Sequence, residues 1–204
     1  MALFKTLTDH IVSLDTETIP QKRKQQLLPL VDFIQNKVDA NLEVPLLFIC
    51  THNSRRSHFA QFWAQVLACH LGFGRVGSFS GGTEVTALHP MVLETLRGYG
   101  FETHGLSQGD NPIYGINFSD RAHPLIGFSK KWQHPFNPRS GFAAVMTCSQ
   151  ADQGCPFVPG AELRVAMDFE DPKVFDQSAE QAEKYRECSL KIATELFFVL
   201  GSVR

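Results

Sequence analysis

The sequence lacks both a strong net charge and a long apolar run. Nineteen Lys and Arg residues stand against 21 Asp and Glu residues, which leaves a formal net charge of -2 at pH 7. Such a chain has no basic field to attract nucleic acid or acidic lipid. No apolar run approaches the roughly 20 residues that a membrane span requires, and residues 1–14 lack the apolar core and cleavage site of a secretory signal. These absences predict a cytoplasmic protein that binds neither nucleic acid nor membranes.

Cysteine is sparse and irregularly spaced, with five residues at positions 50, 69, 148, 155 and 188. An odd number of thiols in a reducing compartment argues against a framework of structural disulfides. No group of Cys, His and carboxylate residues has the regular spacing of metal ligands, so we expect no metal site. Cys69 and Cys188 fall within predicted helices and are interpreted as ordinary core or surface thiols.

The pattern that is present alternates strands with helices. Residues 45–50 form a short apolar run without alternation, which is typical of a central parallel strand buried on both faces. This arrangement predicts an α/β fold, a three-layer doubly wound sheet of about four parallel strands with helices on both faces. The further strands are predicted at residues 75–80, 142–146 and 163–168, and the helices at residues 57–71, 90–99 and 179–200.

Two segments fall outside this alternation. Residues 1–44 are predicted to form a helical N-terminal extension, because apolar residues recur at helical spacing between Leu27 and Val38. The sequence leaves open whether this extension covers the main domain, residues 45–204, or forms a dimer contact. Residues 105–141 are predicted to be a long, mostly irregular insertion. Its aromatic residues are expected to pack it onto the domain, although they could also wall a substrate pocket: Tyr114, Phe118, Phe128, Trp132 and Phe136.

A wholly polar turn, residues 51–57, joins the strand that ends at Cys50 to the next helix. A turn of this length can point successive backbone N–H groups inward and form a nest for an oxyanion, to which the helix dipole adds. Arg56 can return to the same centre, where its planar fork matches two oxygens of a tetrahedral anion. Cys50 would lie at the base of this ring of positive potential, which favours the nucleophilic thiolate.

Other residues of the turn support this interpretation. Ser57 can donate its hydroxyl to the Cys50 sulfur, and Asn53 suits a left-handed backbone conformation. Arg55 is expected to point outward, because the pocket has room for one guanidinium. A Cys and an Arg six residues apart also occur by chance, and a buried cysteine at a strand end is usually a small core residue. The predicted anion site comprises Thr51, His52, Asn53, Ser54, Arg55, Arg56 and Ser57.

Cys148 and Cys155 form a second candidate pair of thiols. Seven residues of rigid helix span about 10.5 Å, whereas a disulfide joins Cα atoms about 4.4–6.8 Å apart. The two thiols could therefore bond only if the intervening segment loops or unwinds, and Asp152, Gly154 and Pro156 favour a flexible loop. The alternatives are two unrelated free thiols or half of a zinc site. Zinc is disfavoured because paired zinc cysteines are usually about two to four residues apart.

An acidic stretch, residues 168–172, follows the last predicted strand. A carboxylic acid here could protonate a leaving oxygen, and of its three acidic residues we favour Asp171, which precedes a proline. The alternative is a solvated turn. Because ligands of parallel sheets bind beyond the carboxyl ends of the strands, Cys50, Cys148 and Asp171 are predicted to meet at one sheet edge.

Three segments together resemble one enzyme family. Residues 48–57, Phe-Ile-Cys-Thr-His-Asn-Ser-Arg-Arg-Ser, are similar to the phosphate-binding loop of low-molecular-weight protein tyrosine phosphatases and of the related thioredoxin-coupled arsenate reductases. Residues 146–159 are similar to the redox-cysteine segment of the reductases, and residues 169–172 to the general-acid loop of both groups. The order and spacing agree over residues 45–200, which implies a phosphatase-like fold for the main domain.

The resemblance also implies a mechanism. Cys50 would attack the arsenic atom of arsenate, while Asp171 supplies the proton with which water leaves. Cys148 would then attack the Cys50 sulfur and release arsenite. Cys155 would resolve that disulfide and leave a Cys148–Cys155 bond for thioredoxin, the electron donor, to reduce. No bound cofactor is implied.

Arsenate reduction is thus the leading of three hypotheses. The first alternative is a low-molecular-weight protein tyrosine phosphatase, which would hydrolyse a phosphomonoester such as phosphotyrosine through a phosphocysteine on Cys50. The second is a non-catalytic oxyanion or redox sensor. The chain also departs from the reductases, because His52 and Arg55 replace a glycine and a second loop cysteine, and Gln61 stands where some reductases place a glutamate linked to potassium binding.

Overall fold

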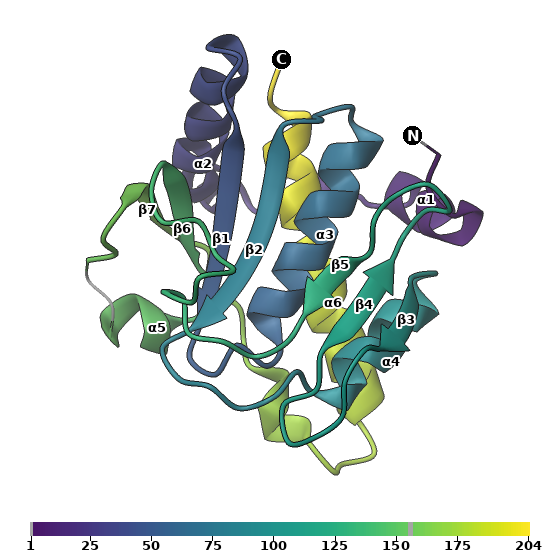
Figure 1. Cartoon of the computed structure of the whole chain (residues 1–204). Coiled ribbons are helices and arrows are strands. Elements are labelled where there is room, and N and C mark those ends of the chain that lie inside the picture. The colour runs from purple at the N-terminus through teal and green to yellow at the C-terminus, as the bar shows by residue number, and fades with distance from the viewer. Residues whose placement is uncertain (1, 155–156) are drawn as a thin grey trace.

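The computed structural model describes residues 2–154 and 157–204. Its central sheet contains four parallel strands in the order β2 (Val76–Gly82), β1 (Val44–Cys50), β6 (Phe142–Met146) and β7 (Ala161–Ala166) (Figure 1). β1 lies between two neighbouring strands and is buried at six of its seven positions, as its unbroken apolar run predicts. The predicted parallel α/β sheet is confirmed.

Helices cover the two faces of the sheet unequally. Leu46 and Phe48 of β1 face a larger core, whereas Leu47 and Ile49 face a smaller one. The smaller core, which also contains Cys50, is covered by α5 (Ser149–Gly154) and by the segment around Trp132. None of the described helices combines the length and the apolar character that crossing a bilayer requires. The long helices on the larger core are α2 (Gln21–Asp39), α3 (Arg56–His70), α4 (Pro90–Gly98) and α6 (Gln181–Gly201).

The N-terminal helices share the larger core with the sheet. A 3-10 turn, η1 (Thr16–Thr18), joins α1 (Lys5–Val12) to α2. The predicted apolar stripe of α2 is buried against α6 and β7, and Arg23 pairs with Glu195 of α6 at 2.9 Å. The amphipathic helix therefore covers the main domain of its own chain.

The predicted insertion is more regular than its sequence indicates. β3 (Glu102–Gly105), β4 (Tyr114–Asn117) and β5 (Leu125–Gly127) form a separate antiparallel sheet in that order. Most of residues 105–141 are irregular, as predicted, but β4 and β5 were not expected, because runs of three or four residues are too short to show alternation. Phe118 is buried and packs as expected, whereas Phe136 leaves 43% of its surface exposed.

Candidate active site

The polar turn after β1 is here called the anion loop (residues 51–57). Its carbonyl oxygens accept hydrogen bonds from residues outside the loop. No backbone N–H group of residues 51–57 donates to an acceptor within the described part of the chain. Unpaired amides beside outward carbonyls are the arrangement of an anion nest. The carbonyl oxygens of Cys50, Thr51, His52 and Ser54 accept hydrogen bonds from Thr83 N, Glu84 N, Ser129 Oγ and His89 N at 3.2, 2.8, 2.8 and 3.1 Å.

Asn53 organises the interior of the loop. Its backbone has a left-handed φ of 45°, and its side chain is completely buried. Asn53 Nδ2 donates to Ser57 Oγ at 2.9 Å, and Ser57 Oγ lies 3.0 Å from Cys50 Sγ. Because Ser57 accepts from Asn53, its hydroxyl hydrogen is free to be donated to the sulfur. This chain of contacts places a hydroxyl donor beside the Cys50 sulfur.

Arg56 connects the anion loop to the acidic stretch. Its Nη1 donates to Phe169 O at 3.0 Å, and its Nη2 donates to Asp171 Oδ2 at 2.5 Å. Arg56 Nε is buried and has no hydrogen-bond acceptor among the described residues. An oxyanion in the nest would provide that acceptor, since a buried guanidinium donor is otherwise costly. Asp171 thus reaches the same loop as Cys50, although it follows a different strand.

Cys148 lies beside the anion loop at the end of β6. It follows β6, is buried in the same core as Cys50, and places its Sγ 3.5 Å from Thr51 Oγ1. Cys50, Cys148 and Asp171 therefore lie at one edge of the sheet, as expected.

The segment after Cys148 is not the loop that we predicted. Residues 149–154 form α5, whose first turn is closed by Ala151 N, which donates to Cys148 Sγ at 3.4 Å. Arg164 further pairs with Asp152 at 2.8 Å. A helix of six residues is too short to reveal itself by periodicity. Cys155, the predicted resolving thiol, lies outside the described residues.

A cleft of about 780 Å³ opens over Arg56, Cys148 and Asp171. Most of its lining residues are polar, and Phe169, the only Phe, Tyr or Trp among the described ones, is 6% exposed. The lining carries both signs of charge, since Arg56, Lys173 and Lys191 stand beside Asp168, Glu170 and Asp171, so an anion would be captured by the nest rather than by a positive cleft.

Arg55 points away from this cleft, as expected, but it is not a surface residue. Its side chain is buried, and its Nη2 donates to Asp176 Oδ2 at 2.5 Å. Its Nε donates to the hydroxyl of Tyr185 on α6. Arg55 can therefore bind an anion in the nest only through its backbone N–H, because its guanidinium is occupied by Asp176 and Tyr185.

Sequence reasoning also missed two buried basic residues behind the loop. Lys130 is 2% exposed, and its backbone N–H donates to Asn53 Oδ1 at 2.9 Å. Burial lowers the pKa of Lys130 to about 7. Burial, and then the charge of Lys130, lower the pKa of His58 well below its ordinary value. No local pattern marks a lysine in a polar insertion as buried.

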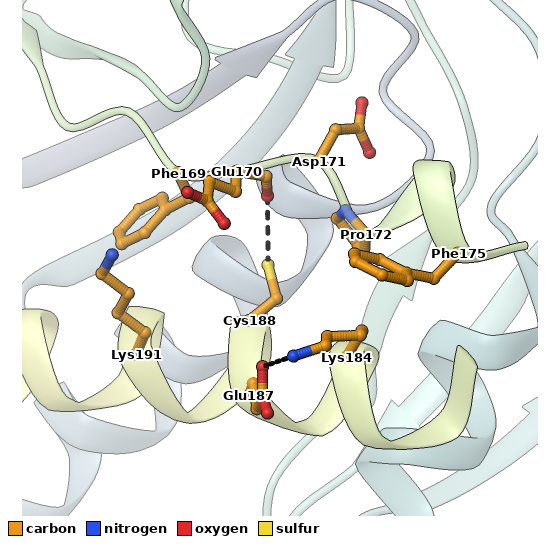
Figure 2. Close-up of a pocket in the computed structure, with 9 residues that line it drawn as sticks. All are labelled: Phe169, Glu170, Asp171, Pro172, Phe175, Lys184, Glu187, Cys188 and Lys191. Atoms are coloured by element: carbon orange, nitrogen blue, oxygen red, sulfur yellow. Dashed lines mark hydrogen bonds and ion pairs between the residues drawn. The ribbon is translucent and has the colours of Figure 1, made fainter. Parts of the chain in front are cut away.

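Cys188 lies under the acidic stretch, as Figure 2 shows. Its Sγ points at Glu170 O, 3.8 Å away, across a cavity of about 170 Å³. Burial raises the pKa of this thiol to about 12, so it is protonated near neutral pH. That state suits the ordinary thiol that the sequence analysis assumed.

Comparison of the sequence with known proteins finds arsenate reductases. No known protein-family profile matches the chain. Arsenate reductase 2 of Staphylococcus epidermidis is 28% identical over 127 residues, which cover 62% of this chain and 77% of that protein. The arsenate reductase of Staphylococcus aureus strain Newman is 27% identical over 128 residues, with the same coverage of 62% and 77%.

Solved structures give the fold. A low-molecular-weight phosphotyrosine phosphatase from Vibrio cholerae O395 superposes with a TM-score of 0.54 at 14% identity, over 78% of this chain and 95% of that one. A low-molecular-weight protein tyrosine phosphatase from T. tengcongensis gives a TM-score of 0.53 at 16% identity, over 79% and 100%. The chain therefore has the fold of low-molecular-weight phosphatases, and its sequence resembles those of arsenate reductases.

Proposed function

We propose that this enzyme reduces arsenate to arsenite with Cys50 as nucleophile and Cys148 and Cys155 as a thiol relay. The observation that carries the proposal is the second buried thiol beside the anion loop, with Cys148 Sγ 3.5 Å from Thr51 Oγ1. Ester hydrolysis requires no such thiol, whereas a two-electron reduction requires a source of electrons at the reacting sulfur. The resemblance to arsenate reductases supports the same reading.

The first step uses the anion loop. Backbone amides and Arg56 hold the arsenate oxygens, while the Cys50 thiolate forms a bond to arsenic. Asp171 gives its proton to a departing oxygen, which leaves as water. The arsenic remains at the +5 state and is covalently attached to Cys50. This step requires Asp171 to be protonated and to leave Arg56, since both the carboxylate and the anion use that guanidinium.

The second step is the reduction. The Cys148 thiolate attacks Cys50 Sγ, and the electron pair of the broken sulfur–arsenic bond passes to arsenic, which leaves as arsenite at the +3 state. Cys155 then attacks Cys148, frees Cys50 and leaves a Cys148–Cys155 disulfide, which a thioredoxin dithiol reduces. Because α5 begins directly after Cys148, its first turn must unwind for these exchanges. The reducing compartment that such a donor requires agrees with the predicted cytoplasmic location.

Phosphomonoester hydrolysis is the second candidate, and it would share the attack by Cys50 and the acid Asp171. The fold of the structural neighbours favours it. The described cleft lining argues against an aryl phosphate, because its only Phe, Tyr or Trp side chain, Phe169, is almost fully buried and leaves little surface for stacking. A non-catalytic sensor would bind the anion without turnover.

A paired assay separates the three functions. Thioredoxin-dependent NADPH oxidation with arsenate and hydrolysis of 4-nitrophenyl phosphate are measured on the wild type, on Cys148→Ser and on Cys69→Ser. Cys69 lies in α3 away from the anion loop and serves as the matched control. We expect Cys148→Ser to lose arsenate turnover and to keep any hydrolysis, while Cys69→Ser keeps both. Fast hydrolysis with inert arsenate would favour the phosphatase, and phosphate binding without either reaction would favour the sensor.

A further inference from the structure

Two consecutive arginines of the anion loop reach the two ends of one short turn. The turn, η2 (Pro172–Phe175), is preceded by Asp171 and followed by Asp176. Arg56 pairs with Asp171 and Arg55 with Asp176, each at 2.5 Å. The acid segment, residues 171–176, is therefore fastened to the anion loop at both ends.

The Asp176 end of the acid segment is fully satisfied. In addition to Arg55, Asp176 accepts hydrogen bonds from Tyr185 at 2.6 Å and from Gln181 at 3.1 Å. Burial alone would raise the pKa of Asp176, but the Tyr185 hydrogen bond and the charge of Arg55 hold it below its ordinary value. Burial and Arg55 lower the pKa of nearby His89. The carboxylate is thus charged near neutral pH, and Arg55 is its permanent cationic partner.

The Asp171 end is held by a contact that the reaction must break. Apart from Arg56, Asp171 accepts only the backbone N–H of Lys173, at 3.1 Å, among the described residues. An oxyanion in the nest takes the same guanidinium fork, because that fork matches two oxygens of a tetrahedral anion. A substrate oxyanion that takes the unpaired Arg56 Nε together with Nη2 displaces Asp171 from Nη2 and releases this end of the acid segment.

The acid segment packs on α6 at only two of its side chains. Pro172 is buried and the Phe175 ring lies 5.5 Å from Lys184 Nζ, but Val174 leaves 78% of its surface exposed. Figure 2 shows the segment lying over α6 with a hollow between them, and the only dashed contact across it joins Cys188 to Glu170. The hollow has a volume of about 170 Å³. Because these contacts lie beside a hollow, the position of the segment also depends on its polar ends.

We propose that Arg55 is a positioning residue, whose pair with Asp176 keeps the acid segment over the anion loop while Arg56 exchanges Asp171 for the oxyanion. The inference rests on the proposed function in one respect, namely that Asp171 acts there as the proton donor. It also explains a departure from the reductases, because an arginine at position 55 gains a partner in Asp176.

The kinetic test is a single turnover of the fully reduced protein with arsenate, followed as arsenite release. Arg55→Met and Asp176→Asn remove the pair from opposite sides, and Arg55→Lys keeps the charge. Asp9→Asn is the matched control, since Asp9 belongs to an exposed pair with Lys5 on α1, away from the acid segment. We expect the saturating rate to fall about tenfold or more, with the half-saturating arsenate concentration changed less than about threefold, because proton donation suffers and anion binding does not. Arg55→Lys should recover part of the rate.

A second measurement does not depend on turnover. Amide hydrogen exchange of residues 171–176 is compared with and without inorganic phosphate, which fills the nest without being reduced. In the wild type and in Asp9→Asn, we expect protection to persist when phosphate binds. In Asp176→Asn, protection should remain without phosphate, where Arg56 still holds Asp171, and should fall when phosphate is added.

The outcomes separate the inference from the proposed function. A wild type that does not reduce arsenate overturns the function, and hydrogen exchange then still decides the role of Arg55. A variant rate within about twofold of the wild type, or unchanged protection in Asp176→Asn with phosphate bound, overturns the positioning role even where arsenate is reduced. If Arg55→Met does not fold, Asp176→Asn tests the same contact.

Discussion

On the side that faces the acid segment, the anion loop is held by two arginines paired with carboxylates, whereas on the side that faces the insertion it is held by neutral hydrogen bonds. There, Ser129 Oγ donates to His52 O at 2.8 Å and Lys130 N donates to Asn53 Oδ1 at 2.9 Å. An incoming anion competes for charged donors but not for bonds made to carbonyl oxygens. The contrast suggests a division of labour, in which the insertion shapes the nest and the acid segment responds to what fills it.

The largest effect is expected from breaking the charged side at Arg56. Arg56→Lys keeps the charge but loses the planar fork that reaches Phe169 O and Asp171 together. We expect kcat/KM for arsenate to fall by about 10²- to 10³-fold, as when one donor to a developing oxyanion is removed. Arg75→Lys provides the control, because Arg75 pairs with Glu43 at an exposed site. Equal losses of kcat/KM in Arg56→Lys and Arg75→Lys would show that the planar fork of Arg56 is not required for the reaction.

A smaller effect should follow from breaking the neutral side at Asn53. Asn53→Gly tolerates the left-handed backbone but removes the acceptor for Lys130 N and the donor to Ser57. We expect a loss of about 2–3 kcal/mol in the free energy of unfolding, because a buried N–H is left unpaired. Asn53→Ala should lose about 1 kcal/mol more through backbone strain. Urea denaturation measures the free energy of unfolding of both variants. A glycine variant as stable as the wild type would show that the hydrogen bonds from the insertion do not stabilise the anion loop.

Lys130 decides whether the side of the anion loop that faces the insertion is neutral. Burial lowers the pKa of Lys130 to about 7, so the unfolded chain binds more protons than the folded one between about pH 7 and pH 10.4. The contribution of this group to the unfolding free energy therefore rises with pH across that window, by about 2 kcal/mol from pH 7 to pH 9, and is constant below it. Lys130→Met should lack this rise, and exposed Lys131→Met should keep it. Parallel stability curves for the wild type and Lys130→Met would contradict a buried, titrating amine.

Much of the fold was predictable because its main elements carry long or unbroken apolar patterns. The run before Cys50 indicates β1, and the periodic stretches indicate α3 and α6. β4, β5 and α5 were not predictable, since elements of three to six residues cannot display a period. α5 in addition depends on Cys148 Sγ accepting from Ala151 N, a local contact that composition does not reveal.

The candidate site divides in the same way. The nest with Cys50, Asn53 and Arg56 is encoded within eight consecutive residues, so its spacing could be read directly. The partners of Arg55 lie 121 and 130 positions along the chain, at Asp176 and Tyr185, and no local signal connects them. Burial of a charged residue is likewise a property of the folded chain rather than of a sequence window.

The packing of α2 limits how this chain can be shortened. Leu27, Leu30 and Ile34 are completely buried, and each such side chain contributes roughly 1.5–3 kcal/mol when it leaves water. Three of them approach the whole net stability of an ordinary domain, about 5–15 kcal/mol. A truncated version that begins at β1 would present bare apolar patches on α6 and β7 to solvent and would tend to aggregate. The smallest stable version of this chain that keeps the anion loop therefore extends upstream of β1 to include α2.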